Sequence, residues 1–141
     1  EIRRAERKST TDLFSYLSSN RHAGVEKLFV TWKGLNFRRN HADIFRKGSY
    51  IPLNEKGNKQ VASVYARNFE NQWIIVAVPF GIAGQMKGPV LQLDEKDTIT
   101  LPAEFPDQWT NLFTGKTITS TGFISLREMF SDFPVVLLYN I

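Results

Sequence analysis

The sequence predicts an α+β chain, with short helices over residues 1–47 followed by an antiparallel β-sandwich over residues 48–141. Apolar residues recur at helical spacing in the first part, and from residue 50 onward they gather in short β-branched and aromatic runs. Glycine and proline separate these runs, which is typical of antiparallel sheets. With 141 residues, of which 42% are hydrophobic, the chain is long enough to bury a core.

The N-terminal part predicts a short helix after a charged lead. Residues 1–8, EIRRAERK, are expected to be solvated or to form a frayed helix. The hydroxyls of residues 9–11 are candidate N-caps ahead of Asp12, whose carboxylate suits the positive end of a helix dipole. This helix is expected to end at residues 18–20.

A second helix is predicted from the spacing of its apolar side chains, which fits one face of an amphipathic helix. These residues are Val25, Leu28, Phe29, Trp32 and Leu35. A further helical turn is expected at residues 43–45. Gly48 follows it and is predicted to end it in the left-handed conformation.

From residue 50 the pattern predicts strands. The strongest runs are residues 61–67 and 73–78, joined by a polar hairpin connection at residues 68–72. Five shorter strands are expected at residues 98–101, 109–113, 117–119, 122–126 and 135–139. Residues 127–130 predict one helical turn.

Charge and composition limit the partners and the compartment. Residues 1–47 carry 11 Lys and Arg against 5 Asp and Glu, a net charge of +6, whereas the remainder is net −2. A basic half can indicate nucleic-acid binding, but a solvated helical surface is the preferred interpretation, so no nucleic-acid partner is predicted. The sequence shows no signal peptide and no membrane-length apolar run. Cysteine is absent, which suits a reducing compartment, and a cytoplasmic location is predicted.

Patterns that carry catalysis fit the chain poorly. FTGKT, residues 113–117, resembles the end of a phosphate-binding loop, but Thr110 stands where that loop needs its first glycine, so a β-turn around Gly115 is predicted. His22 and His41 are the only histidines, and their separation of 19 positions does not match the spacing of a metal-ligand motif. The acidic cluster at residues 94–97 contains a lysine and is interpreted as a solvated turn. We therefore predict no catalytic residue, no metal and no cofactor in this chain.

Aromatic residues are the remaining candidates for ligand binding, because a flat ring can stack on the C–H face of a sugar. Trp32 and Trp73 are predicted to lie in the core. Trp109 begins a predicted strand after a polar segment, and it is the tryptophan with the best prospect of exposure, although core packing is the preferred interpretation. Trp109 and Tyr50 are the weak candidates for substrate binding.

Several segments, in order, resemble one known family. KLFVTWKGLNFRRNHADIFRKGSYIPL, residues 27–53, resembles the junction between the barrel and the C-terminal domain in the α-amylase superfamily, and within it the maltooligosyltrehalose synthase family. VASVYARNFENQWIIVAVP, DTITLP, WTNLFTGKTI and LREMFSDFPVVLLYN are similar to later segments of that family. Residues 81–96 and the first twenty residues match poorly. The residues assigned to the junction are Phe45, Gly48, Tyr50, Pro52 and Leu53.

The resemblance implies that the chain is the C-terminal portion of a larger enzyme, and the absence of an initiator methionine at Glu1 fits this expectation. Residues 1–47 would be a remnant of the catalytic (β/α)8 barrel, and residues 48–141 would brace that barrel. The parent enzyme would convert the reducing-end α-1,4 linkage of a maltodextrin to an α,α-1,1 linkage. Its acidic catalytic residues would lie in the barrel, outside this chain. The alternatives are an accessory carbohydrate-binding sandwich and the C-terminal domain of another glucanotransferase of this superfamily.

The implied seam carries one structural prediction. If a helix ends at Gly48 and a new domain begins at Tyr50, then Phe45, Tyr50 and Leu53 should be substantially buried beside the junction.

Overall fold

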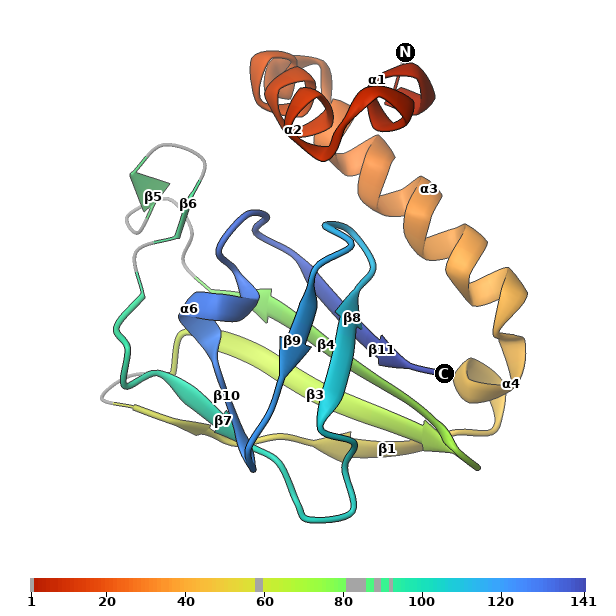
Figure 1. Cartoon of the computed structure of the whole chain (residues 1–141), viewed down its shortest axis with the longest axis vertical. Helices are drawn as coiled ribbons and strands as arrows, with labels where there is room; N and C mark the ends of the chain where they lie inside the picture. Colours follow the sequence, from red (N-terminus) through yellow and green to blue (C-terminus); the bar gives the residue numbers. More distant parts are fainter. Residues whose placement is uncertain (1, 58–59, 81–85, 88–89, 92) are drawn as a thin grey trace. The chain divides into compact units, whose positions relative to one another are not determined.

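The computed structural model describes residues 2–57, 60–80, 86–87, 90–91 and 93–141, with side chains described outside residues 81–92. It contains a few helices and mainly antiparallel strands, which confirms the predicted α+β class (Figure 1). Cα packing divides the chain into two units, residues 1–40 and residues 41–141. The sequence had suggested a boundary seven residues later, so the last helical turn groups with the strands.

The described residues of the first unit form helices joined by short turns. It comprises α1 (Ile2–Lys8), α2 (Thr10–Ser19), a 3-10 turn (Arg21–Ala23) and α3 (Val25–Asn40). Helix α2 begins as predicted, because the Ser9 hydroxyl accepts a hydrogen bond of 3.0 Å from the Asp12 backbone N–H. Helix α1 packs against α2, and α2 contacts α3. The lead segment of eight residues therefore adds a helix to the bundle.

The buried side of α3 differs from the predicted apolar face. Phe29 and Phe37 are buried, but Leu28 is 59% exposed and Leu35 is 60% exposed. Apolar spacing shows that a helix has a stripe, but it does not show which part of a broad stripe is covered. Two large aliphatic side chains of α3 thus remain at the surface of this structure.

The second unit starts with α4 (Ala42–Arg46), includes α6 (Leu126–Met129), and is otherwise built from strands. The strands are β1 (Ser49–Pro52), β2 (Glu55–Lys56), β3 (Ala62–Phe69), β4 (Gln72–Pro79), β5 (Met86–Lys87), β6 (Val90–Leu91), β7 (Thr98–Thr100), β8 (Gln108–Asn111), β9 (Thr117–Thr119), β10 (Phe123–Ser125) and β11 (Val136–Asn140). Each predicted strand is present, with ends that differ by a few residues.

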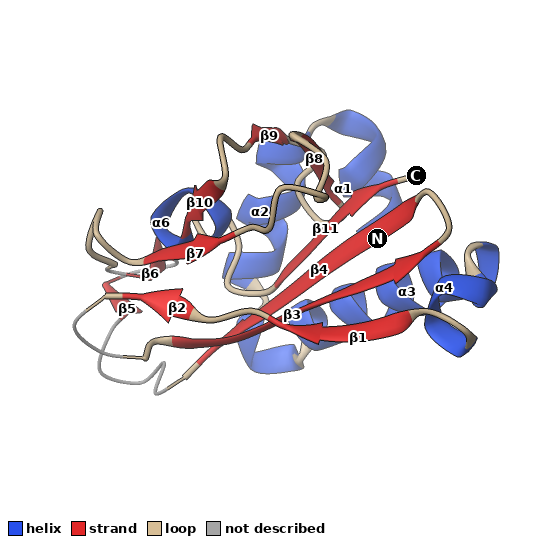
Figure 2. Cartoon of the chain, turned by 90° about the horizontal axis from the view of Figure 1, so that it is seen from below, coloured by secondary structure: helices blue, strands red, loops and turns tan. Residues whose placement is uncertain are grey.

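The strands form one large sheet and two small ones. The large sheet has the order β1-β3-β4-β11-β8-β9, the second has the order β10-β7-β2, and β5 pairs with β6. All of the recorded pairs are antiparallel. Among the described residues β1 and β9 are the edge strands of this sheet, and each pairs with another strand on one side only. The six-stranded sheet is therefore open and does not close into a barrel (Figure 2).

The β3–β4 hairpin is the longest pairing in the unit, with Ala62 opposite Pro79 and Phe69 opposite Gln72. Only Glu70 and Asn71 remain to make the turn, and Glu70 adopts a positive φ of 53°, as two-residue hairpin turns require. The Asn68 side-chain amide donates to the backbone carbonyls of Glu70 and Gln72. The predicted polar connection is therefore confirmed, in a tighter form.

A hydrophobic core lies between the large sheet and the second sheet. Alternate residues of β3 and β4 point into it, and Ile99 of β7 and Ile124 of β10 join them from the other side. The core members are Leu53, Val61, Ala62, Val64, Ala66, Ile75, Ala77, Ile99, Leu101, Phe105, Trp109, Ile118, Ile124, Leu126, Met129, Phe130, Val136 and Leu138. All of these lie in the second unit, and Ile74 and Leu137 of the large sheet are buried outside this cluster.

Candidate functional site

The predicted seam is a close contact between the end of α4 and strand β3. Gly48 follows the helix, and a Cβ added there would lie 2.2 Å from the Ile44 carbonyl oxygen and 3.2 Å from that of Asn68. Both obstacles are backbone atoms, which cannot turn aside. The prediction of a left-handed Gly48 is wrong, because its φ does not lie in the positive range. Glycine is needed here for space.

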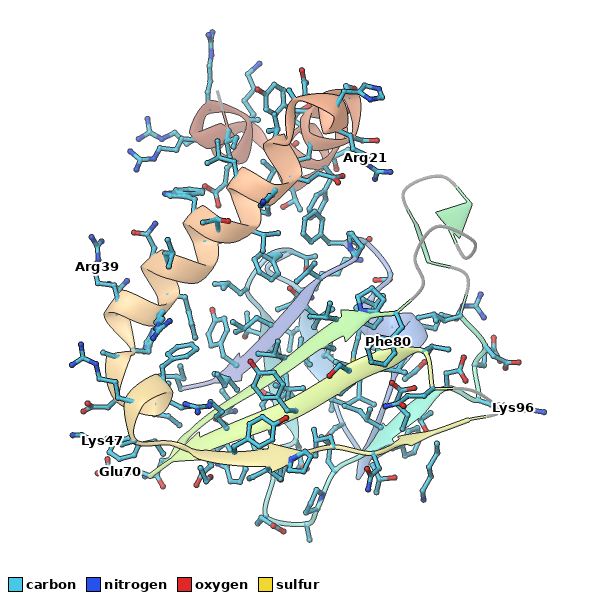
Figure 3. All side chains as sticks on the ribbon, turned by 180° about the vertical axis from the view of Figure 1, so that it is seen from behind. Arg21, Arg39, Lys47, Glu70, Phe80 and Lys96 are labelled. Atoms are coloured by element: carbon cyan, nitrogen blue, oxygen red, sulfur yellow. The ribbon has the colours of Figure 1, made fainter. Side chains whose placement is uncertain are left out.

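Arg67 of β3 holds the helix end in place. Its Nη1 donates to the carbonyl oxygens of Ile44 at 3.2 Å and Phe45 at 2.5 Å. These carbonyls belong to the last turn of a helix, whose C=O groups lack partners within the helix. Figure 3 shows the end of α4 at Lys47 beside the β3–β4 turn at Glu70. The seam is thus pinned by a charged hydrogen bond as well as by packing.

The residues beside the seam are buried unequally. Leu53 is buried, Phe45 is half-buried, and Tyr50 is 60% exposed, so the prediction of burial is wrong for Tyr50. Tyr50 lies on the edge strand β1, opposite Arg67, on the sheet face that points away from the core. Its ring lies 5.1 Å from that of Tyr65. Pro52 is also exposed and ends β1 at the same edge.

Trp109 lies inside the core. It is 1% exposed, on the inward side of β8, and its ring centroid lies 6.3 Å from that of Phe105. Its indole Nε1 has no hydrogen-bond partner among the described residues. Because neighbouring strand residues face opposite ways, the exposed Gln108 takes the outward position instead. Trp109 offers no face to a ligand, and this removes one candidate for sugar binding.

The other two tryptophans are both partly covered by neighbouring side chains. Trp73 is half-buried and packs on Phe105 with a centroid distance of 4.4 Å. Trp32 on α3 is half-buried, with the Arg3 guanidinium 5.4 Å and the Lys33 ammonium 5.9 Å from its ring centroid. Cations therefore already occupy the surroundings of the Trp32 ring.

The FTGKT segment forms the predicted turn between β8 and β9. Gly115 has a φ of 72°, and the Asn111 side chain accepts hydrogen bonds from the backbone N–H groups of Phe113 and Thr114. A phosphate-binding loop would present such N–H groups to its ligand. Here a buried asparagine already uses them, so the segment closes a hairpin.

The acidic cluster is only partly solvated. Asp97 is 8% exposed, and its carboxylate accepts a 3.0 Å hydrogen bond from the backbone N–H of Asp94. The prediction of a solvated turn is wrong for this residue, because Asp97 organises the turn from within. In this cluster and in the rest of the described chain, no three His, Asp or Glu side chains meet in a way that could hold a metal ion.

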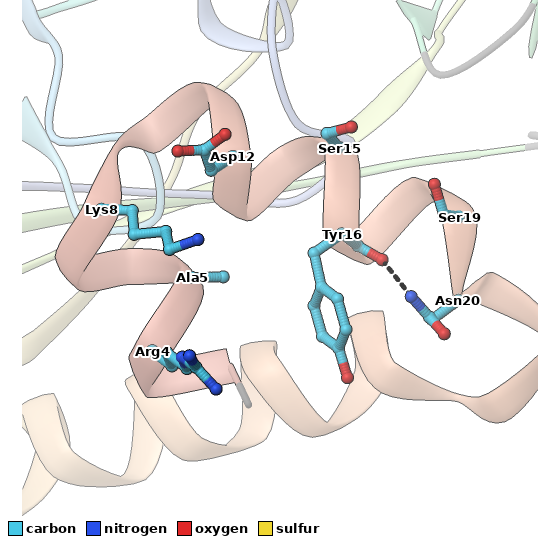
Figure 4. Close-up of a pocket in the computed structure, with 8 residues that line it drawn as sticks. All are labelled: Arg4, Ala5, Lys8, Asp12, Ser15, Tyr16, Ser19 and Asn20. Atoms are coloured by element: carbon cyan, nitrogen blue, oxygen red, sulfur yellow. Dashed lines mark hydrogen bonds between the residues drawn. The ribbon is translucent and has the colours of Figure 1, made fainter.

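Described residues of the helical unit line at least two hollows. One, of about 440 Å³, lies between α1 and α2 and is lined by Arg4, Ala5, Lys8, Asp12, Ser15, Tyr16, Ser19 and Asn20 (Figure 4). The other, of about 510 Å³, is mainly apolar and is lined by Ile2, Arg3, Tyr16, Val25, Leu28 and Trp32. In the first hollow, Asp12 offsets part of the positive charge of Arg4 and Lys8, which weakens it as an anion site.

Two residues that position the fold escaped the sequence analysis. Besides Arg67, Glu55 of β2 accepts hydrogen bonds from the backbone N–H groups of Val61 at 2.8 Å and Ala62 at 2.7 Å. An arginine inside a strand-like run, such as Arg67, can be recognised in the sequence as a residue that needs a polar partner, because charged residues are unusual in such runs. Glu55 cannot be recognised in this way, because its partners are backbone N–H groups of residues 61 and 62, and their position depends on the path of the loop between β2 and β3.

Comparison with protein-family models, curated proteins and solved structures found no match. None of the helices among the described residues combines the length and the apolar character needed to cross a bilayer.

Proposed function

We propose that the chain is the C-terminal portion of a maltooligosyltrehalose synthase, in which the two sheets form a sandwich that braces a catalytic barrel. The observation that carries the proposal is the series of five segments between residues 27 and 140 that resemble that family in the same order. The helical unit would then contain the last helices of the barrel. The parent reaction would be an intramolecular transglycosylation from an α-1,4 to an α,α-1,1 linkage.

Two structural features support a bracing role. The seam between α4 and β1 is held by the close approach at Gly48 and by the hydrogen bonds of Arg67, so α4 has a defined position on the β-unit. The helical unit also leaves Leu28 and Leu35 exposed, and Leu28 lines the apolar hollow around Trp32. Apolar surface of this kind is commonly covered by a further part of a protein. The missing barrel would supply that cover.

The upstream DNA provides the first test. We expect the reading frame to continue for several hundred codons before Glu1 and to encode barrel motifs. A stop codon shortly before Glu1, followed by an independent start, would contradict the proposal.

An assay with maltopentaose provides the second test. The protein encoded by the extended frame should convert maltopentaose to a non-reducing product that ends in a trehalose unit, with loss of reducing sugar. The 141-residue chain should leave the substrate unchanged. Turnover by the short chain would contradict the placement of catalysis in the barrel, and transfer products that keep a reducing end would indicate another glucanotransferase.

A further inference from the structure

The outer face of the second sheet carries a hollow whose residues come from three strands. It has a volume of about 420 Å³ and is lined by Lys56, Thr98, Thr100, Thr121, Gly122 and Phe123. Volumes of this size are common in sites for small ligands. Figure 2 shows β2, β7 and β10, the strands that build this face, side by side.

Strand register fixes which side chains reach the hollow. Phe123 pairs with Thr100, and Lys56 pairs with Thr98, so these four side chains share one face of the sheet. The alternate residues Ile99 and Ile124 are buried in the core, which forces their neighbours outward. Phe123 is consequently 53% exposed and cannot turn into the core without a shift in strand register.

The chemistry of the lining selects a class of ligand. Among the described residues no carboxylate lines the hollow, so these residues offer no charged ligand to a metal cation. The one ammonium among them, that of Lys56, binds a phosphate only weakly by itself. Three hydroxyls surround one exposed aromatic ring. This combination suits a neutral ring compound that has an apolar C–H face and hydroxyls at its edge, which describes a pyranose.

We propose that this hollow, the Phe123 site, binds a neutral α-glucan chain, with one sugar ring stacked on Phe123 and its hydroxyls bonded to Thr98, Thr100 and Lys56. The choice of an α-glucan rests on the proposed function, whereas the choice of a neutral sugar rests on the lining alone. The site lies in the β-unit and contains none of Trp109, Tyr50 or the seam residues.

Titration of the full 141-residue chain with maltoheptaose, followed by backbone amide NMR, tests the site. We expect a dissociation constant of about 1 mM, with shifts centred on residues 98–100 and 121–123. Phe123→Ala should weaken binding about tenfold through loss of the stacking surface. Thr100→Val keeps the shape but removes a hydroxyl, and should weaken binding about fivefold.

Two variants serve as matched controls. Phe80→Ala removes another exposed aromatic side chain of the same unit, which is 46% exposed (Figure 3), and Tyr50→Ala removes the aromatic candidate of the edge strand. Both should bind maltoheptaose like the parent chain. Absence of shifts at 10 mM maltoheptaose, or binding that Phe123→Ala leaves intact, would overturn the site. Loss of binding on Tyr50→Ala would move sugar binding to the edge strand and would also overturn it.

Cellohexaose distinguishes the ligand classes. Weaker binding of this β-linked chain supports the α-glucan assignment, and equal binding overturns it. The outcome is independent of the upstream reading frame. Failure of the barrel proposal would leave the titration interpretable, and failure of the titration would leave the maltopentaose assay unaffected.

Discussion

At the scale of single residues, Gly48 shows how a glycine can be required for reasons that a sequence does not reveal. Glycine after a helix usually predicts a left-handed cap. Here the backbone of the helix and that of β3 approach so closely that no Cβ fits, and φ stays outside the left-handed region. The pattern predicted the residue that matters at the seam, but it predicted the wrong reason.

Gly48→Ala should therefore destabilise the β-unit by about 1–3 kcal/mol, because the new methyl group must displace backbone atoms. Gly34→Ala is the matched control. A Cβ there meets nothing within 4 Å, and alanine in mid-helix should stabilise α3 by up to about 1 kcal/mol. Urea unfolding followed by circular dichroism measures both effects. Equal stability of the Gly48→Ala variant and the parent chain would show that the backbone around Gly48 can move to admit a methyl group at little cost in free energy.

At the scale of elements, the positions of the strands in the sequence were largely predictable. The side of the sheet to which each side chain points was less so. The runs at residues 61–67 and 73–78 became β3 and β4 because β-branched residues and a two-residue turn agree locally. The faces of Trp109 and Tyr50 depend on the pairing register and on which strand lies at the edge, and neither is a local property. The same limit hid the Phe123 site, because its members come from strands that are distant in sequence.

The start of β3 depends on a side chain from β2. Glu55 satisfies two backbone N–H groups, those of Val61 and the buried Ala62. Glu55→Ala should cost about 1–3 kcal/mol in the free energy of unfolding, since these donors would lose their partner. Glu55→Gln keeps one acceptor oxygen, so its free energy of unfolding should lie between that of the parent chain and that of Glu55→Ala.

Glu104→Ala, at an exposed position in the loop between β7 and β8, is the control and should change stability by less than about 0.5 kcal/mol. Chemical denaturation under identical conditions gives the free energy of unfolding of all three variants. A cost for Glu55→Ala no larger than that of the control would mean that water replaces the carboxylate at the start of β3.

At the scale of the whole molecule, the division after residue 40 assigns α4 to the strands rather than to the helices before it. The sequence suggested residue 47, because helical spacing continues to that point and the strand pattern starts afterwards. Contacts decide otherwise, since α4 packs on β3 and its last carbonyls bind Arg67. Secondary structure thus changes at one position and packing changes at another.

Two truncated chains separate these boundaries. The chain of residues 41–141 keeps α4 and the hydrophobic core between the two sheets, so it should fold alone and give a well-dispersed amide NMR spectrum. The chain of residues 48–141 lacks the buried Ile44 and both carbonyl partners of Arg67, and should be less stable by about 2–5 kcal/mol.

The urea midpoints of the two chains give the comparison. Arg67→Met in the chain of residues 41–141 tests the contribution of the hydrogen bonds alone. Equal midpoints would place the boundary at residue 47, whereas an unfolded 41–141 chain would show that the β-unit needs the preceding helices. A difference that Arg67→Met reproduces only in part would assign the remainder to the packing of α4 on β3.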